Sequence, residues 1–316
     1  MACHHLPGGI REIPATQRPN VSVKIQRYEK ALFKIDTTRF QSQLESLKKE
    51  FPYFLAGDLH DSANLKQLYA YVTDTQLIKL YHQTLRVFPD LNPEEKQLST
   101  AFSYLKHYYP HYNLPKVYSY VSGIYFEHPV LKRNNLIIIA LDDYLGRHFA
   151  PYSQLHIPRY HQRCMERNFI PVDVLKAMYI TDFKKPAPNR TLLDKMIEAG
   201  KQLYFLDAML PTTPDSTKIG YSTRQLKWMN AHKRDVWAVL VKNHLIYSVD
   251  YMALMKLTQD GPFTEGFSQQ SPPRMAAWFG WQIVRTYMQK HPDKTPEDLF
   301  SIRDAQHLLQ ASGYKP

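Results

Sequence analysis

The chain has 316 residues, of which 44% are hydrophobic and 13% aromatic, and its formal net charge is +11. This composition allows one large folded domain or two smaller ones, and it excludes a disordered chain. No stretch approaches the roughly 18 consecutive apolar residues that a membrane-spanning helix needs. Lys and Arg residues are scattered, without a zinc-finger or RNA-recognition motif, so we expect no nucleic-acid partner.

The first half of the chain is predicted to be helical after a short extended segment at 21–25. Apolar spacing and helix stop signals indicate helices at 39–51, 64–71 and 75–88. Another helix begins at Asn92-Pro93-Glu94-Glu95, which combines a cap, an early proline and acids in the first turn.

Strand patterns replace helical ones between 114 and 141. Apolar and polar residues alternate at 117–121, a further extended segment covers 123–127, and an apolar run at 136–140 is expected to be buried on both faces of a sheet. Because this order shows no β–α–β alternation, it predicts an α+β fold that is mostly helical, with a small central β-sheet.

Helices return in the second half. They are predicted at 163–179, with an interruption near Pro171, at 191–209, and from a capping box at Ser222–Gln225 to about 245. The loops between them are too short to be interdomain linkers. We therefore predict a single domain at 25–316 that follows an N-terminal tether at 1–24.

The segment from Arg274 to Met288 has the length of a helix but is apolar on nearly every side, which is typical of a buried helix. Gln282 and Arg285 lie within it, and a buried amide or guanidinium needs polar partners. Gly280 weakens such a helix by about 1 kcal/mol relative to Ala. This cost predicts that another backbone packs closely against Gly280.

We group Trp281, Gln282 and Arg285 with Asp142 as a candidate polar network. It is either structural, with Arg285 bound to a carboxylate, or a site for a peptide or glycan. The structural interpretation is favoured, because buried ion pairs are commonly structural.

Motifs of common catalytic sites are absent from the sequence, including HExxH, GxSxG, the P-loop and GxGxxG. Asp142 and Asp143 follow the apolar run, where carboxylates can hold a metal or act as acid and base. A turn or helix cap is favoured, since no matching ligand set is evident. His107 and His111 have helical spacing, but Pro110 disfavours a continuous helix there. We expect no catalytic residue, cofactor or metal.

The two cysteines, Cys3 and Cys164, form no CxxC motif, so a thiolate zinc site is not expected. Cys164 is predicted to be a small buried apolar residue. Cys3 follows Met1 and Ala2. This order results when the signal peptide of a lipoprotein is replaced by a new initiator Met and a small residue, placed directly before the lipidated Cys. An ordinary intracellular N-terminus is the alternative, and without a hydrophobic signal segment the residues leave both open.

Short motifs in order over 25–316 resemble the GldB family of gliding-motility lipoproteins. They include Arg27–Glu29, Leu47–Phe54, His107–Pro110, Leu141–Gly146, Asn189–Leu193, Met196–Tyr204, Lys218–Tyr221, Gln225–Trp228, Leu245–Asp250 and Trp278–Met288. The resemblance implies an outer-membrane lipoprotein that faces the periplasm and is lipidated at Cys3, with Met1 and Ala2 added ahead of the mature chain. It also implies partners in the gliding-motility and type IX secretion machinery.

The chain also shows a distant likeness to zincin-type peptidases, in which a HExxH helix precedes a helix ending in Glu-Gly. The equivalent stretches would be Pro171–Ala177 and Met196–Gly200. Asp173 and Ala177 would then hold the two His positions, and Ala199 stands before Gly200. This alignment implies a peptidase-like scaffold without zinc ligands.

The sequence leaves three candidate functions open. The favoured one is a non-catalytic accessory lipoprotein that acts through protein contacts. The others are a residual hydrolase that uses Asp142, Asp143 or Glu198 in a cleft, and a module that binds a peptide or glycan.

Overall fold

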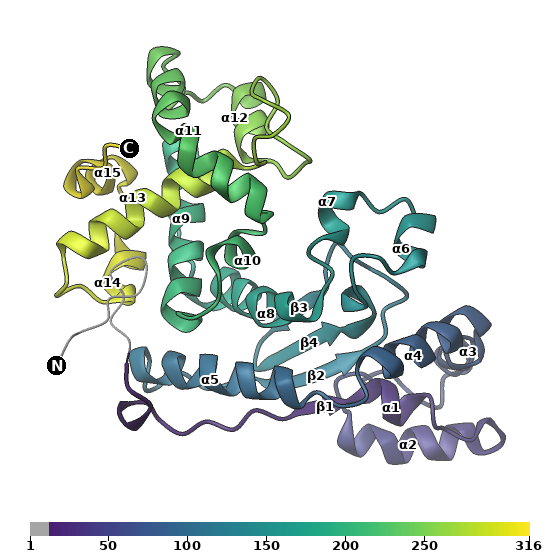
Figure 1. The fold of residues 1–316 in the computed structure, drawn as a ribbon. Coiled ribbons are helices and arrows are strands. Elements are labelled where there is room, and N and C mark those ends of the chain that lie inside the picture. The colour runs from purple at the N-terminus through teal and green to yellow at the C-terminus, as the bar shows by residue number, and fades with distance from the viewer. Residues whose placement is uncertain (1–12) are drawn as a thin grey trace.

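Four strands form one mixed sheet between the two helical halves of the molecule (Figure 1). In the order β1-β2-β4-β3 they are β1 (Ile25–Arg27), β2 (Lys116–Tyr120), β4 (Leu136–Ala140) and β3 (Val130–Arg133). β2 pairs in parallel with both β1 and β4, and β3 pairs antiparallel with β4. The structure is a computed structural model and describes residues 13–316.

The α+β, mostly helical class with a small sheet is confirmed, but two details of the strand prediction are wrong. The extended segment predicted at 21–25 leads into β1 at 25–27, but β1 pairs in parallel with β2 across a helical connection, which is a β–α–β crossover that was not expected. A three-residue strand is too short to show an alternating pattern. The segment 123–127 is a turn rather than a strand, because the Asp142 carboxylate accepts the backbone N–H of Ile124 within it.

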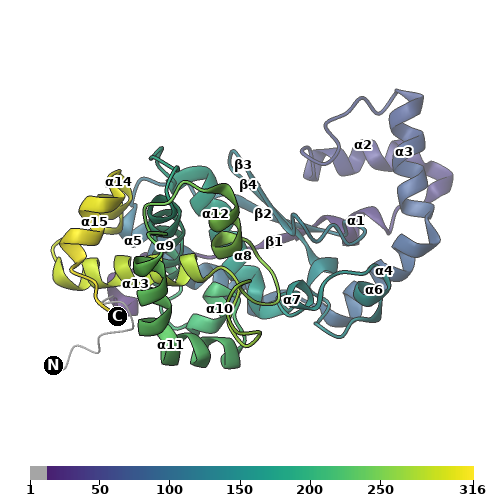
Figure 2. The same cartoon turned by 90° about the horizontal axis from the view of Figure 1, so that it is seen from above.

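Five helices connect β1 to β2. They are α1 (Tyr28–Leu32), α2 (Phe40–Glu50), α3 (Ser62–Thr73), α4 (Thr75–Val87) and α5 (Asn92–Tyr108). Asp61 and Asp74 accept backbone N–H groups at the starts of α3 and α4, which satisfies donors that a helix terminus leaves free. In Figure 2, α2 and α3 project from the end of the molecule opposite α14 and α15.

The two faces of the sheet contact different cores. Val117, Ile137 and Ile139 pack into the main hydrophobic core, whereas Tyr118 belongs to a smaller cluster with α1 and α2. Alternate residues of a strand point to opposite faces, so one strand can serve both cores. The 136–140 run is accordingly fully buried on one face and only half-buried at Leu136 and Ile138.

The second half of the chain is helical. Its elements are α6 (Ala150–Gln154), α7 (Arg159–Gln162), α8 (Ile170–Met178), the π-helical turn η5 (Tyr179–Phe183), α9 (Leu192–Met209), α10 (Asp215–Ile219), α11 (Thr223–Lys242), α12 (Tyr251–Thr258), α13 (Met275–Lys290), α14 (Pro296–Ser301) and α15 (Ala305–Ser312). The predicted capping box at Ser222 and Gln225 is present at the start of α11. No helix among residues 13–316 is both long and apolar enough to cross a membrane.

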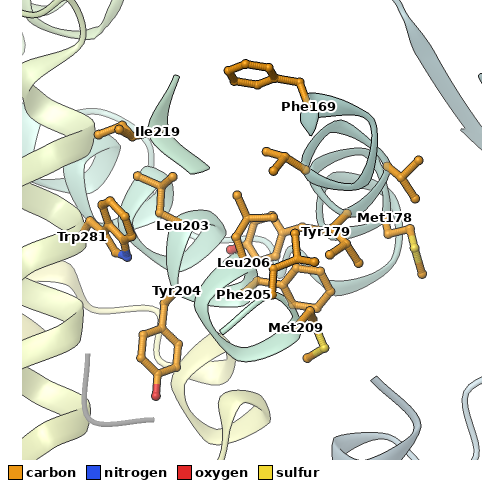
Figure 3. Close-up of a cluster of buried hydrophobic side chains, with 14 of the residues drawn as sticks. Phe169, Met178, Tyr179, Leu203, Tyr204, Phe205, Leu206, Met209, Ile219 and Trp281 are labelled. Atoms are coloured by element: carbon orange, nitrogen blue, oxygen red, sulfur yellow. The ribbon is translucent and has the colours of Figure 1, made fainter. Parts of the chain in front are cut away.

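α9 is the buried centre of this half. Figure 3 shows Leu203, Phe205, Leu206 and Met209 of α9 in one cluster with Met178 of α8 and Tyr179 of η5, with Trp281 of α13 nearby. The Phe205 ring lies 5.7 Å from the Tyr179 ring, centroid to centroid. Fully burying such side chains stabilises a fold by about 1.5–3 kcal/mol each.

α9 and α13 cross at two glycines. A Cβ atom on Gly280 would overlap the backbone oxygen of Met196, and one on Gly200 would overlap the backbone of Gly280. The expectation that another backbone packs against Gly280 is confirmed. The two helices approach more closely here than any side chain would allow.

The chain ahead of β1 lies along α5. Ile13 and Val23 are buried in the main core, and the Arg18 guanidinium stacks 4.1 Å from the centre of the Tyr104 ring. The Val23 N–H donates to the Ser99 hydroxyl of α5 at 2.9 Å. Residues 13–24, expected to belong to a tether, therefore pack against the domain.

β1 itself is held to α5 by Glu95. One oxygen of this carboxylate accepts the Ile25 N–H at 3.0 Å, and the other pairs with Lys24 at 2.7 Å. One α5 side chain thus fixes both the backbone and a side chain at the start of the sheet.

Candidate functional site

Asp207 lies at the centre of a buried polar network on α9. Its carboxylate accepts hydrogen bonds from Trp281 Nε1 at 2.7 Å, from Lys218 Nζ at 2.8 Å, and from Nε and Nη2 of Arg285 at 2.8 Å each. Arg285 also donates to both oxygens of Asp215, at 2.7 and 2.8 Å. Its guanidinium stacks on the Trp281 ring, 3.7 Å from the ring centre.

Electrostatics hold Arg285 and Asp215 in their charged forms. Burial acts to lower the pKa of Arg285, but hydrogen bonds to Asp215 and Asp207 outweigh burial and raise it. Burial likewise acts to raise the pKa of Asp215, but the hydrogen bond from Arg285 lowers it overall. Because two carboxylates balance two cations and every Arg285 nitrogen already donates, the network ties α9, α10 and α13 together.

The structure brings together only two of the four residues predicted for this network. Trp281 and Arg285 meet on Asp207, as the structural interpretation requires. Gln282 is half-buried, and its side chain makes no hydrogen bond to any described residue. Asp142 is buried but bonds a different segment of the chain.

Sequence reasoning missed Asp207, Asp215 and Lys218. A signal for Asp207 was present, because it is the only charged residue in the run Leu203–Leu210, which is otherwise apolar apart from the Tyr204 hydroxyl. An acid on the apolar side of a helix needs a buried cation. Lys218 and Asp215 lie on a helix of five residues, which is too short to show which side is buried.

Asp142 stabilises a strained turn after β2. Its carboxylate accepts the backbone N–H groups of Ser122 at 2.8 Å and Ile124 at 2.7 Å, and the Ser122 hydroxyl at 3.0 Å. The enclosed Gly123 and Ile124 have φ angles of 83° and 65°. This left-handed conformation is costly for a β-branched residue such as Ile124. The favoured interpretation of Asp142 as a turn residue matches this geometry.

Asp143 is the buried neighbour of Asp142 in the turn η3 (Leu141–Tyr144). Neither carboxylate oxygen of Asp143 has a partner among the described residues. The single proton of the Ser122 hydroxyl is donated to Asp142, so none remains for Asp143. Burial, and then the charge of Asp142, raise the pKa of Asp143 to about 8. The Asp143 carboxyl therefore keeps its proton at neutral pH.

A pocket of about 300 Å³ lies between η5 and α9. On its wall the Tyr179 hydroxyl donates to Glu198 at 3.2 Å, and Lys184 lies 3.7 Å from the same carboxylate oxygen. π-Helical turns are frequent at functional sites. Neither Asp142 nor Asp143 lines this pocket.

The stretches that we compared with zincins lie partly at this pocket. Glu198 and Ala199 line it, but Asp173 and Ala177 do not. Asp173 instead accepts the Tyr144 hydroxyl at 3.0 Å and pairs with Lys176 at 3.3 Å. The likeness to zincin-type peptidases remains a prediction.

Metal and thiol chemistry have no assembled site in the part of the chain that the structure describes. No group of three or more His, Cys, Asp or Glu residues there could hold a metal ion. Cys164 is half-buried and unpaired, and burial raises the pKa of its thiol. Cys3, the predicted lipidation site, lies outside the described residues.

The geometry thus defines a mostly helical α+β protein whose central charges hold its helices together. The family model for the gliding motility protein GldB matches residues 11–316, nearly the whole chain, and the chain belongs to this family. No curated protein and no solved structure matches it. The resemblance drawn from short motifs is confirmed, and family membership indicates a role in gliding motility.

Proposed function

We propose that this protein is a non-catalytic lipoprotein of the gliding-motility and type IX secretion machinery. It is anchored to the outer membrane through Cys3, faces the periplasm, and acts through contacts with other proteins of that machinery. The observation that carries the proposal is the family match over residues 11–316.

The arrangement of the buried charges supports a non-catalytic role. Asp207, Asp215, Lys218 and Arg285 satisfy one another, so this buried cluster presents no free acid, base or nucleophile. The sequence also lacks the HExxH motif of zinc peptidases. We infer that this peptidase-like scaffold serves as a platform for protein contacts.

Replacing Cys3 in the gene of a gliding bacterium tests the anchor. Cys3→Ser is expected to abolish incorporation of labelled palmitate, to release the protein from the membrane fraction and to stop colony spreading. Cys164→Ser is the matched control and leaves all three unchanged. Lipid labelling that persists in Cys3→Ser overturns the anchor.

Deletion of the gene tests the role in the machinery. It is expected to stop both colony spreading and the release of secreted cargo into the medium. Unchanged release in a strain that no longer spreads contradicts the link to type IX secretion. Stoichiometric metal in protein purified without chelator, together with peptide hydrolysis, contradicts the non-catalytic assignment.

A second candidate function is binding of a peptide in the pocket at Glu198, favoured by the Tyr179 and Lys184 side chains that converge on its carboxylate. Glu198→Gln tests it. Lost spreading with unchanged thermal stability supports a binding site there, and normal spreading rules it out.

A further inference from the structure

An exposed apolar tip lies where α11 ends and α12 begins. Twelve large hydrophobic side chains are exposed among the described residues, and half of them lie in the 14-residue stretch 239–252. Their exposed fractions lie between 39% and 68%, and they are Val239, Val241, Tyr247, Val249, Tyr251 and Met252. Figure 1 shows these two helices at the edge of the molecule away from the sheet. Clustered exposure of this kind marks an interaction surface.

The tip is firmly attached to the core, so its exposure is a fixed property of the fold. Leu240, Ile246 and Leu254 are buried beneath it. The Leu193 N–H of α9 donates to the Ile246 carbonyl at 2.8 Å, and the Leu192 N–H donates to Ser248 at 3.0 Å. Asp250 caps α12 by accepting the Ala253 N–H at 2.7 Å.

The helix that leads to the tip is strongly basic. α11 carries five cations and one acid, Asp235. None of the five forms an ion pair with a described residue, and they are Arg224, Lys227, Lys233, Arg234 and Lys242. Arg234 and Val241 are both exposed and lie seven residues, or about two turns, apart on one face of α11, so positive charge and exposed apolar surface meet there.

A lipid surface fits this combination. Cations beside exposed Tyr and aliphatic side chains are typical of segments that lie at a bilayer surface. Unpaired cations are attracted to anionic headgroups. We propose that the tip and the basic side of α11 dock onto an anionic lipid surface, as a contact separate from any lipid on Cys3.

Vesicle sedimentation with the full, unacylated chain tests this proposal, independently of the role in motility. The protein is mixed with vesicles of phosphatidylcholine alone or of equal parts phosphatidylcholine and phosphatidylglycerol. We expect binding to the mixed vesicles, little binding to phosphatidylcholine, and weakening as salt is raised. Equal binding to both compositions, or none to either, overturns the proposal.

Variants of the tip separate docking from the general positive charge of the protein. The double substitution Val249→Asp and Tyr251→Asp is expected to reduce vesicle binding about tenfold with unchanged helix content, because carboxylates cannot enter an anionic interface. The control Tyr53→Asp with Tyr125→Asp adds the same two carboxylates at tyrosines that are 53% and 54% exposed and lie outside the tip, and it leaves binding unchanged. If both variants bind like the wild type, net charge alone explains binding and the tip has no part in it.

A photoreactive amino acid at position 249 distinguishes lipid from protein in cells. Crosslinks to phospholipid support the proposal. Crosslinks to one protein, with none to lipid, overturn it in favour of a protein-docking tip.

Discussion

Two buried acidic sites in this protein have opposite surroundings. Asp207 receives four hydrogen bonds and two balancing cations at the crossing of α9 and α13, whereas Asp143, beside β4, has no hydrogen-bond partner among the described residues. A buried charge that is fully paired fixes the positions of the elements around it. One without partners gives up its charge instead, and its pKa rises.

The largest loss of stability is expected at the crossing of α9 and α13, where the region around Asp207 is most tightly packed. Gly280→Ala places a Cβ atom into the backbone of Met196, so α9 and α13 cannot cross as they do. Because backbone cannot move aside like a side chain, we expect loss of at least about 4 kcal/mol or failure to fold. Gly261→Ala, where the added atom meets only ordinary contacts, is the control. Urea unfolding measures both, and a stable Gly280→Ala protein would contradict this crossing.

The next largest loss of stability is expected when the central carboxylate of the network is removed. Asp207→Asn leaves Lys218 and Arg285 with one acid between them, and unpairing a buried charge costs about 3–5 kcal/mol. Asp235→Asn alters an exposed acid on α11 and should change the free energy of unfolding by less than about 0.5 kcal/mol. If both variants unfold at the same urea concentration, the network does not stabilise the fold.

Asp142→Asn tests the strained turn. The amide retains one acceptor oxygen but loses the charge that binds two backbone N–H groups, so we expect a loss of about 1–3 kcal/mol. Faster hydrogen exchange at Ser122 and Ile124 should accompany the loss. Unchanged exchange at these two amides would show that the turn holds without the carboxylate.

Asp143→Asn should increase the free energy of unfolding at alkaline pH, whereas the substitutions above lower it. The pKa of this group rises from 3.8 to about 8 in the folded chain, which therefore holds a proton that the unfolded chain has lost. The free energy of unfolding then falls as the pH rises through that window. An amide cannot ionise, so at about 1.4 kcal/mol per pH unit the variant should gain up to about 5 kcal/mol over the wild type at pH 8 and less than about 1 kcal/mol at pH 4. Parallel stability–pH curves would refute the raised pKa.

The smallest effect is expected for Gln282→Leu. Its side chain is half-buried without a hydrogen bond to a described residue, so the free energy of unfolding should change by no more than about 0.5 kcal/mol. Arg285→Met in the neighbouring turn of α13 should instead cost several times more, as for Asp207. Equal effects from the two substitutions would place Gln282 inside the network after all.

Local rules predicted much of the fold. Caps and apolar spacing found α2, α4, α9 and α11 within a few residues, and the burial of α13 followed from its composition. The glycine in α13 even predicted a close backbone neighbour. Features that depend on distant partners were missed, because neither the parallel pairing of β1 nor the meeting of Asp207 with Lys218 leaves a pattern along the chain.

The site was predictable only in part for the same reason. The need of Arg285 for a carboxylate follows from its own segment, but the identity of that carboxylate depends on how α9 and α10 are oriented. Gln282 was grouped with it because both are polar in one apolar run. Trp281 and Arg285, four residues apart, both face Asp207. Gln282 is instead turned about 100° from Trp281 and lies to one side of that contact.

The attachment of β1 to α5 also has a mechanical consequence. A pull on the chain ahead of Val23 loads the Val23–Ser99 bond, the two contacts of Glu95 and the parallel ladder between β1 and β2 along the strand direction. These bonds resist in shear and share the load, so traction on the chain just ahead of Val23 is passed to the long helix α5 and to the sheet together.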